Sequence, residues 1–319
     1  MSGRPPEVTV VIPTLEREGR LRAALEALAA QTLARERFEV IVVRGSERPP
    51  GPPASAPAGL AVRFLAAPAA GAAVQRNVGW RAGDGAVVAF TDDDCRPAPE
   101  WLDRLLAAGA AGTIVQGRTE PDPAELGDLR GYARTMRVTG LDPWAPTCNI
   151  AYPRELLERV GGFDERFPGA WGEDTDLALR ALDAGASRAY EPGALVHHAV
   201  HRRSLLRALR EAAGRSNIHL VIARHPRQRR ELYLGLFASR THASLLAAAA
   251  GVWLLRRRRL LRFAGAAPYL YAYFDRGAGW TPARAARWAL ISVPRRVPVD
   301  AAELAAMAIS SARFRVLVL

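Results

Sequence analysis

FTDDDC, residues 90–95, places three consecutive carboxylates directly after the apolar run Ala86 to Phe90. That run has the length and the β-forming residues of a short buried strand that ends at the acidic turn. Open α/β sheets bind ligands at the carboxyl ends of their strands, so a ligand site is expected here. Asp92 and Asp94 can turn toward one point and hold a hard cation, Mg²⁺ or Mn²⁺. The alternative is a solvated acidic turn leading to a helix, because Asp is common in both places.

The segments around this turn alternate between strand and helix patterns. Val8 to Ile12 is a β-branched run typical of a central strand, and Leu21, Leu25 and Leu28 follow at helical spacing. Phe38 to Val43 is the next strand, which completes a βαβ unit and predicts a parallel sheet. The pattern further predicts strands over 62–65, 113–117 and 148–152 and helices over 71–83, 101–108 and 154–160, and it leaves 119–146 irregular.

A second acidic cluster lies in GAWGEDTDLALRALDAGA, residues 169–186. Its leucines predict a helix that begins near Glu173 and ends near Gly185. Acids in the first turn suit the helix dipole, and this alone explains at least one of Glu173, Asp174 and Asp176. Two short β segments are predicted next, over 187–190 and 194–197, and His198 and His201 follow.

Six motifs follow one another along the chain: VTVVIPT at 8–14, the strand Phe38 to Val43, QRNVGW at 75–80, VVAFTDDD at 87–94, CNIAYPRELLERVGGFDE at 148–165 and GEDTDLALRALDAG at 172–185. Together they resemble the bacterial-type family 2 inverting glycosyltransferases, which have the GT-A fold. The resemblance covers about residues 7–200. It implies a Rossmann-like mixed sheet flanked by helices that binds a nucleotide-diphosphate sugar. No single motif is specific, but six at plausible spacing form a strong signal.

The resemblance assigns roles on the donor side. Pro13, Thr14 and Glu16, in the loop after the first strand, are expected to line the nucleotide base and ribose. Arg76 and Asn77 are expected to line the donor pocket near the diphosphate. Asp92 and Asp94 match the DxD acids. Asp94 is expected to be the main metal ligand, with Asp92 facing the ribose or sharing the metal and Asp93 structural. His198 is expected to complete the metal site, with His197 as the second choice. The donor-binding residues implied in this way are Pro13, Thr14, Glu16, Arg76, Asn77 and Asp92.

The same resemblance makes Asp174 the catalytic base and has Glu173 position the base or the acceptor. The chemistry asks for these groups. The acceptor hydroxyl has a very high pKa and needs a carboxylate to take its proton. The diphosphate leaving group gains negative charge, which Mg²⁺ or Mn²⁺ stabilises. A base on the face opposite the leaving group gives inversion.

One position departs from the family pattern. Where relatives carry one or two Asp after the second strand, this chain reads VVRGSE with Arg44 in place of an acid. Recognition of the base through that Asp is therefore not expected: either Glu47 substitutes for it, or Arg44 marks a different nucleotide. A uridine donor stays only mildly favoured.

Charge divides the chain into two halves. Residues 1–200 carry 22 Arg and 27 acids, whereas residues 201–319 carry 22 Arg and 5 acids; the chain has no Lys. This asymmetry predicts a polyanionic partner for the second half. Two cysteines provide no disulfide framework, and no secretory signal opens the chain, so a reducing cytoplasm is expected.

Residues 201–319 are predicted to form a helical, Arg-rich second region. Two apolar stretches, 241–255 and 263–274, flank RRRR at 256–259. Three interpretations compete: amphipathic helices on an anionic membrane surface, a short hairpin that dips into lipid, and a helical appendage packed on the catalytic domain. Nucleic-acid binding is disfavoured because the chain contains no zinc pattern and no nucleic-acid motif.

These observations predict a metal-dependent inverting glycosyltransferase that uses a UDP-sugar or a related donor. The expected acceptor is a hydroxyl of a glycan or a lipid-linked glycan, at the inner face of the cell membrane. One alternative is a polyprenyl-phosphate sugar synthase, whose phosphate acceptor needs no strong base, and Glu173-Asp174 argues against it. The other is a non-catalytic GT-A-like protein that binds membranes.

Overall fold

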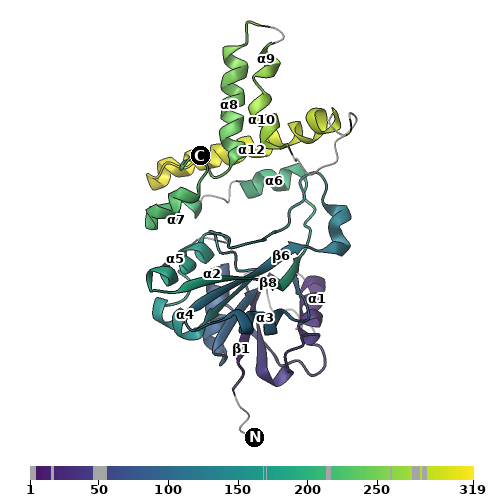
Figure 1. Ribbon diagram of the computed structural model, residues 1–319, viewed down its shortest axis with the longest axis vertical. Helices are drawn as coiled ribbons and strands as arrows, with labels where there is room; N and C mark the ends of the chain where they lie inside the picture. Colours follow the sequence, from purple (N-terminus) through teal and green to yellow (C-terminus); the bar gives the residue numbers. More distant parts are fainter. Residues whose placement is uncertain are drawn as a thin grey trace. The chain divides into compact units, whose positions relative to one another are not determined.

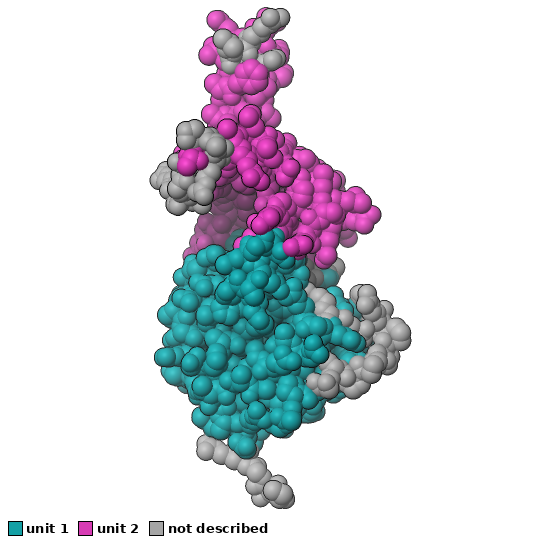
Figure 2. Space-filling view, turned by 90° about the vertical axis from the view of Figure 1, so that its right-hand side faces the viewer, with its two compact units in different colours: residues 1–128, 134–201 teal, residues 129–133, 202–319 magenta. Residues whose placement is uncertain are grey.

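The computed structural model describes residues 5–15, 18–45, 56–167, 169, 171–212, 217–258, 261–274, 281 and 286–319. The chain forms two compact units, coloured separately in Figure 2. Unit 1 contains residues 1–128 and 134–201, and unit 2 contains residues 129–133 and 202–319.

Unit 1 is built on an eight-stranded mixed sheet of order β3-β2-β1-β4-β7-β6-β8-β5 (Figure 1). The half that holds β1 is parallel: β1 pairs in parallel with β2 and β4, and β2 with β3. β7 runs antiparallel to β4 and β6, and β5 runs antiparallel to β8. The strands are β1 Val8–Thr14, β2 Phe38–Arg44, β3 Val62–Ala66, β4 Val87–Thr91, β5 Cys95–Pro97, β6 Thr113–Pro121, β7 Asn149–Pro153 and β8 Ser187–His198.

Two hydrophobic layers cover the sheet. Alternate residues of β1 point to opposite faces, so Val10 packs in one layer and Val11 in the other. The first layer contains side chains of α1 and α3, and Leu21, Leu25 and Leu28 are buried there at their predicted spacing. The second layer contains side chains of α2, α4 and α5. The helices are α1 Glu18–Ala29, α2 Ala72–Ala82, α3 Trp101–Ala108, α4 Arg154–Val160 and α5 Glu173–Asp183, with 3₁₀ turns η1 Arg35–Arg37 and η2 Pro123–Asp128.

Two local predictions were wrong. The strand predicted over 113–117 continues to Pro121, so part of the segment expected to be irregular belongs to β6. The two β segments predicted over 187–190 and 194–197 form one strand, β8, whose pairing with β6 shifts register between Gly117 and Arg118. The alternating pattern is lost at that irregularity, which made one strand look like two. The acidic turn leads into β5 before the helix begins.

Unit 2 is helical, as predicted. Two of its helices, α8 and α12, extend over 15 and 18 residues. Among the described residues, none of the helices combines the length and the hydropathy of a membrane span. The elements are α6 Leu205–Ala212, α7 Asn217–Arg224, η4 Pro226–Glu231, α8 Arg240–Leu254, α9 Leu261–Ala264, α10 Ala267–Ala272, η5 Trp288–Ser292, η6 Pro294–Arg296 and α12 Val297–Phe314.

Candidate active site

The acidic turn lies at the carboxyl end of β4, next to the carboxyl end of β1. Its middle residue, Asp93, is fully buried, and the Thr14 hydroxyl donates a 2.6 Å hydrogen bond to Asp93 Oδ2. This bond ties the ends of two adjacent strands together. Asp93 thus has a structural contact, and Asp92 and Asp94 are the members of the turn that face other polar groups.

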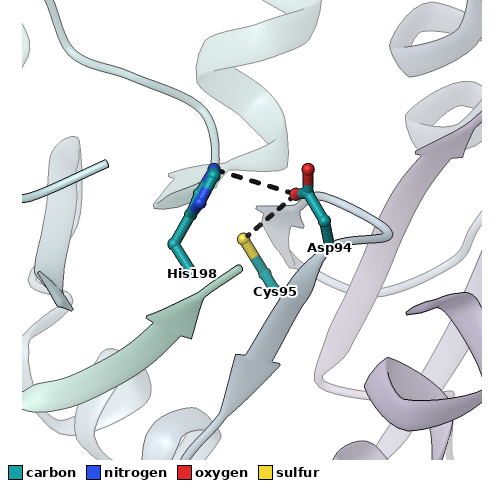
Figure 3. Close-up of side chains that lie close together, drawn as sticks. All are labelled: Asp94, Cys95 and His198. Atoms are coloured by element: carbon teal, nitrogen blue, oxygen red, sulfur yellow. Dashed lines mark hydrogen bonds and ion pairs between the residues drawn. The ribbon is translucent and has the colours of Figure 1, made fainter. Parts of the chain in front are cut away.

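Asp94 faces His198 across the antiparallel pairing of β5 and β8 (Figure 3). His198 Nε2 lies 3.8 Å from Asp94 Oδ1. His198 Nδ1 lies 2.8 Å from the carbonyl of Ala199, to which it donates as an N–H, and this tautomer leaves a lone pair on Nε2. One carboxylate oxygen and one imidazole nitrogen therefore point toward the same place, and both atom types suit Mn²⁺ or Mg²⁺.

Cys95 lies in the same group, with its Sγ 3.9 Å from Asp94 Oδ1 (Figure 3). Burial raises the pKa of this thiol well above its ordinary value. The protonated thiol is a poor ligand, and hard cations prefer oxygen. The donor set that fits a divalent ion is therefore Asp94 and His198.

His201 is a further contact of Asp94 that the sequence did not single out. Its Nε2 lies 2.8 Å from Asp94 Oδ2, and its ring meets that of His198 edge-on at 5.9 Å. The spacing of His198 and His201 in the sequence could have indicated that both contact Asp94. It does so only if the chain after β8 is known to be extended. His197 pairs opposite Arg96, one position along β8 from His198, so its side chain points to the other face of the sheet.

Arg76 joins the acidic turn to the second acidic cluster. One guanidinium nitrogen donates to Asp92 Oδ1 at 3.1 Å and another to Glu173 Oε1 at 2.8 Å. Burial of the guanidinium disfavours its charge, but the carboxylates of Asp92, Glu173 and Asp174 more than offset this and raise its pKa above the ordinary value. Arg76 is therefore a permanent cation at the centre of the site.

Glu173 and Asp174 begin α5 in different environments. Glu173 is buried, and its Oε2 has no hydrogen-bond partner among the described residues. Asp174 accepts a 2.8 Å hydrogen bond from the backbone N–H of Thr175. Burial, followed by the negative charge of Glu173, raises the pKa of Asp174 to about 7. Asp176 is instead bound to Arg180 of the same helix at 2.8 Å, so its role is within the helix.

The loop before α5 is strained. Trp171 and Gly172 have φ values of 102° and 94°. For a bulky aromatic residue this conformation costs about 1–3 kcal/mol. The Trp171 ring is 42% exposed, and the guanidinium of Arg134 lies 4.4 Å from its centroid. Trp171, an exposed aromatic residue with a strained backbone, thus lies three residues before Asp174.

The remaining donor-side residues lie in two places. Pro13 and Thr14 are the buried last residues of β1. Asn77 on α2 is fully buried and bonded to protein groups: it donates to the Phe163 carbonyl at 2.9 Å and accepts from Trp80 Nε1 at 2.9 Å. These contacts give Asn77 a role in the fold, and its contact with a donor stays a prediction.

Two positions discussed from the sequence, Glu16 and Glu47, lie outside the described residues. Arg44, the departure from the family pattern, ends β2, and its guanidinium lies 5.8 Å from the centroid of the Phe64 ring.

Comparison with known proteins agrees with this architecture. Residues 9–161 match the family model described as glycosyl transferase family 2. A "Pre-mycofactocin glycosyltransferase" of Mycobacterium tuberculosis is 31% identical over 215 residues, which cover 62% of this chain and 44% of that protein. A "Validoxylamine A glucosyltransferase" of Streptomyces hygroscopicus subsp. limoneus is 30% identical over 215 residues, which cover 55% of this chain and 48% of that protein. The chain thus spans about half the length of these two relatives.

A solved structure shares the fold. The mannosyltransferase PcManGT from Pyrobaculum calidifontis, in complex with GDP-Man and Mn²⁺, aligns with a TM-score of 0.59 and 20% identity. The alignment covers 96% of this chain and 87% of that one. The predicted GT-A fold is thereby confirmed.

Proposed function

We propose that this chain, whose residues 9–161 match the glycosyl transferase family 2 model, is a metal-dependent, inverting glycosyltransferase of that family. It moves a sugar from a nucleotide-diphosphate donor to a hydroxyl group of a glycan or a lipid-linked glycan. The observation that carries this proposal is the arrangement around Arg76. Its guanidinium contacts Asp92 of the acidic turn and Glu173 of the second cluster, so the donor-side and acceptor-side carboxylates share one site.

Asp174 acts as the base. A carboxyl group with a pKa of about 7 is a carboxylate in half of the molecules at neutral pH, and it holds a transferred proton better than an ordinary Asp. It takes the proton of the acceptor hydroxyl while the oxygen forms a bond to the anomeric carbon. The bond to the diphosphate breaks with its electron pair on the leaving oxygen. Glu173, held by Arg76, lies beside Asp174 and adds to the effect of burial in raising the pKa of Asp174.

In this proposal the donor diphosphate binds beside the acidic turn and Arg76. Asp94 and His198 would hold the divalent ion, and Asp92 would share it or face the ribose. When bound, the ion supplies positive charge to the leaving diphosphate. Arg76 adds a second, fixed positive charge near the same group, since its pKa is raised.

The raised pKa of Asp174 favours a hydroxyl acceptor over a phosphate acceptor. A polyprenyl phosphate is already an anion at neutral pH, so its attack needs no base. The donor nucleotide is less constrained because Arg44 replaces the usual acid, and uridine is the first nucleotide to test. The charge division of the chain supports work at the inner face of an anionic membrane.

A donor screen tests the proposal. The full chain is incubated with UDP- and GDP-sugars in Mn²⁺, in Mg²⁺ and in chelator, and release of the nucleoside diphosphate is measured. We expect at least one donor to be hydrolysed slowly with metal and not with chelator. If none is bound or hydrolysed under any metal condition, the chain is a non-catalytic member of the family.

A further inference from the structure

We propose that the hairpin formed by α8, α9 and α10, residues 240–274, docks its tip onto an anionic lipid bilayer. The hairpin tip is defined as the described residues 251–258 and 261–265. Figure 1 shows α8 beside α9 and α10, with α9 at the end of the hairpin remote from α12. This inference concerns unit 2 alone and does not depend on glycosyl transfer.

The two arms of the hairpin touch through glycines. A Cβ on Gly265 would lie 2.5 Å from the backbone carbon of Gly251, and one on Gly251 would lie 3.0 Å from Gly265 Cα. Only glycine permits so close an approach. The arms therefore meet with little side-chain surface between them, and the larger side chains at the tip point outward.

Those outward side chains are apolar and exposed. Trp253 is 61% exposed, Leu254 69% and Phe263 66%. Val252 and Leu261 add to the same surface at 40% and 52%. Exposed apolar groups gathered in so short a segment mark an interaction site, whereas single exposed residues do not.

Positive charge lies within the same tip. Arg256, Arg257 and Arg258 are exposed. The Arg256 guanidinium lies 4.2 Å from the centroid of the Trp253 ring and donates to the Trp253 carbonyl at 2.9 Å. Residues 232–274 contain six Arg and no Asp or Glu. Arg beside Trp, with no acid nearby, matches the boundary between phosphate headgroups and acyl chains.

The opposite end of the hairpin is held by polar contacts. Buried His242 of α8 lies 3.1 Å from Glu303 of α12. The hydroxyls of Tyr269 on α10 and of Tyr273 just after it donate to Asp300 of α12 at 2.8 and 2.5 Å. The hairpin is thus anchored to α12 at one end and apolar and cationic at the other. The combination of apolar and cationic groups at the tip favours lipid as the partner, because an anionic bilayer offers both a hydrocarbon layer and phosphates.

Vesicle flotation tests the proposal with the full chain. Vesicles of phosphatidylcholine are compared with vesicles that contain phosphatidylglycerol, at low and high salt. We expect the protein to float with the anionic vesicles and much less with the neutral ones. The triple variant Arg256→Gln, Arg257→Gln, Arg258→Gln is expected to lower partitioning to anionic vesicles at least tenfold. The double variant Trp253→Ser, Phe263→Ser is expected to lower partitioning to both lipids.

Matched controls distinguish binding through the hairpin tip from nonspecific adsorption of exposed apolar side chains to vesicles. Ile309→Ser removes an aliphatic side chain of α12 that is 71% exposed, and it is expected to float like the wild type. Acyl-brominated lipid is expected to quench part of the tryptophan emission in the wild type, and Trp253→Phe is expected to lose that part. Thermal unfolding checks that each variant is folded, and donor hydrolysis without vesicles is expected to be unchanged.

Wild-type protein that stays unbound with both vesicles overturns the proposal. So does flotation that the triple and double variants leave intact. Because flotation needs no turnover, and hydrolysis needs no vesicle, failure of one proposal is distinguishable from failure of the other.

Discussion

Arg76 and Asp174 show how single residues give this site its chemistry. Arg76 is cationic because three carboxylates surround it, and Asp174 is a weak acid because burial and Glu173 oppose its charge. The two effects come from one cluster, so a change at either residue alters the other. A substitution of Asp174 is expected to change both the rate of sugar transfer and the pH dependence of stability.

We expect Asp174→Asn to lower sugar transfer by about 10²–10⁴-fold, the usual contribution of a general base. In the wild type, transfer is expected to rise about tenfold per pH unit below the pKa of about 7 and to level off above it. Initial rates of transfer between pH 5 and 9 check this. Undiminished transfer by Asp174→Asn would exclude Asp174 as the base.

The same substitution is expected to stabilise the fold at alkaline pH. The native pKa of Asp174, about 7, lies above the ordinary value of 3.8, so the native state keeps a proton that the unfolded chain releases between these values. This residue's contribution therefore falls as pH rises through that window. A one-unit shift corresponds to about 1.4 kcal/mol, so Asp174→Asn should gain at least about 1 kcal/mol at pH 8 relative to pH 4. Chemical denaturation at the two pH values measures it, and an equal effect at both would contradict it.

The adjacent histidines His197 and His198 at the end of β8 allow a controlled test of the metal site. His198→Gln is expected to weaken Mn²⁺ binding about 10–100-fold, because its Nε2 faces Asp94 and its Nδ1 is fixed by the Ala199 carbonyl. His197→Gln is the control, since this neighbour points to the other face of the sheet. Titration calorimetry with Mn²⁺ alone measures both. Equal losses, or none, would remove His198 from the site.

At the scale of elements, α2 brings Arg76 to the sheet by a close approach at Gly79. A Cβ there would lie 2.4 Å from Val11 Cγ1 and 3.2 Å from Val43 Cγ2. We expect Gly79→Ala to destabilise the protein by about 1–3 kcal/mol through overpacking. Gly19→Ala in α1 meets nothing within 4 Å and should stabilise by about 0.5–1 kcal/mol through helix propensity. Denaturant midpoints compare the two, and a change of the same sign in both would contradict the close packing.

The sequence predicts elements that are set by a local residue pattern, but not contacts between segments that are far apart in the chain. The strands β1, β2 and β4 and the helix α2 follow from local apolar patterns, and the structure confirms them. The contact between His201 and Asp94 could not be predicted, because it depends on the extended chain after β8. The bridge from Arg76 to Asp92 and Glu173 depends on how α2 packs beside α5, which no local pattern contains.

At the scale of the whole molecule, chemistry and charge are divided between the two units. The described carboxylates, histidines and guanidinium of the candidate site belong to unit 1, whereas the hairpin tip belongs to unit 2. The second half of the chain has 22 Arg against 5 acids, which suits long-range attraction to an anionic surface. Ligand binding and membrane docking are therefore expected to stabilise different parts of the chain.

Hydrogen exchange can measure this division. A ligand that binds only the native state raises its stability by about 2.7 kcal/mol at 100 times the Kd, and protection rises most in the segments it contacts. With Mn²⁺ and a nucleoside diphosphate, we expect slower exchange at 91–95, 173–176 and 197–201 and unchanged exchange in α8 and α12. Asp94→Asn should abolish the additional protection from exchange that Mn²⁺ provides. Slower exchange in α8 upon nucleotide binding would contradict independent units and would instead mean that donor binding is coupled to the hairpin.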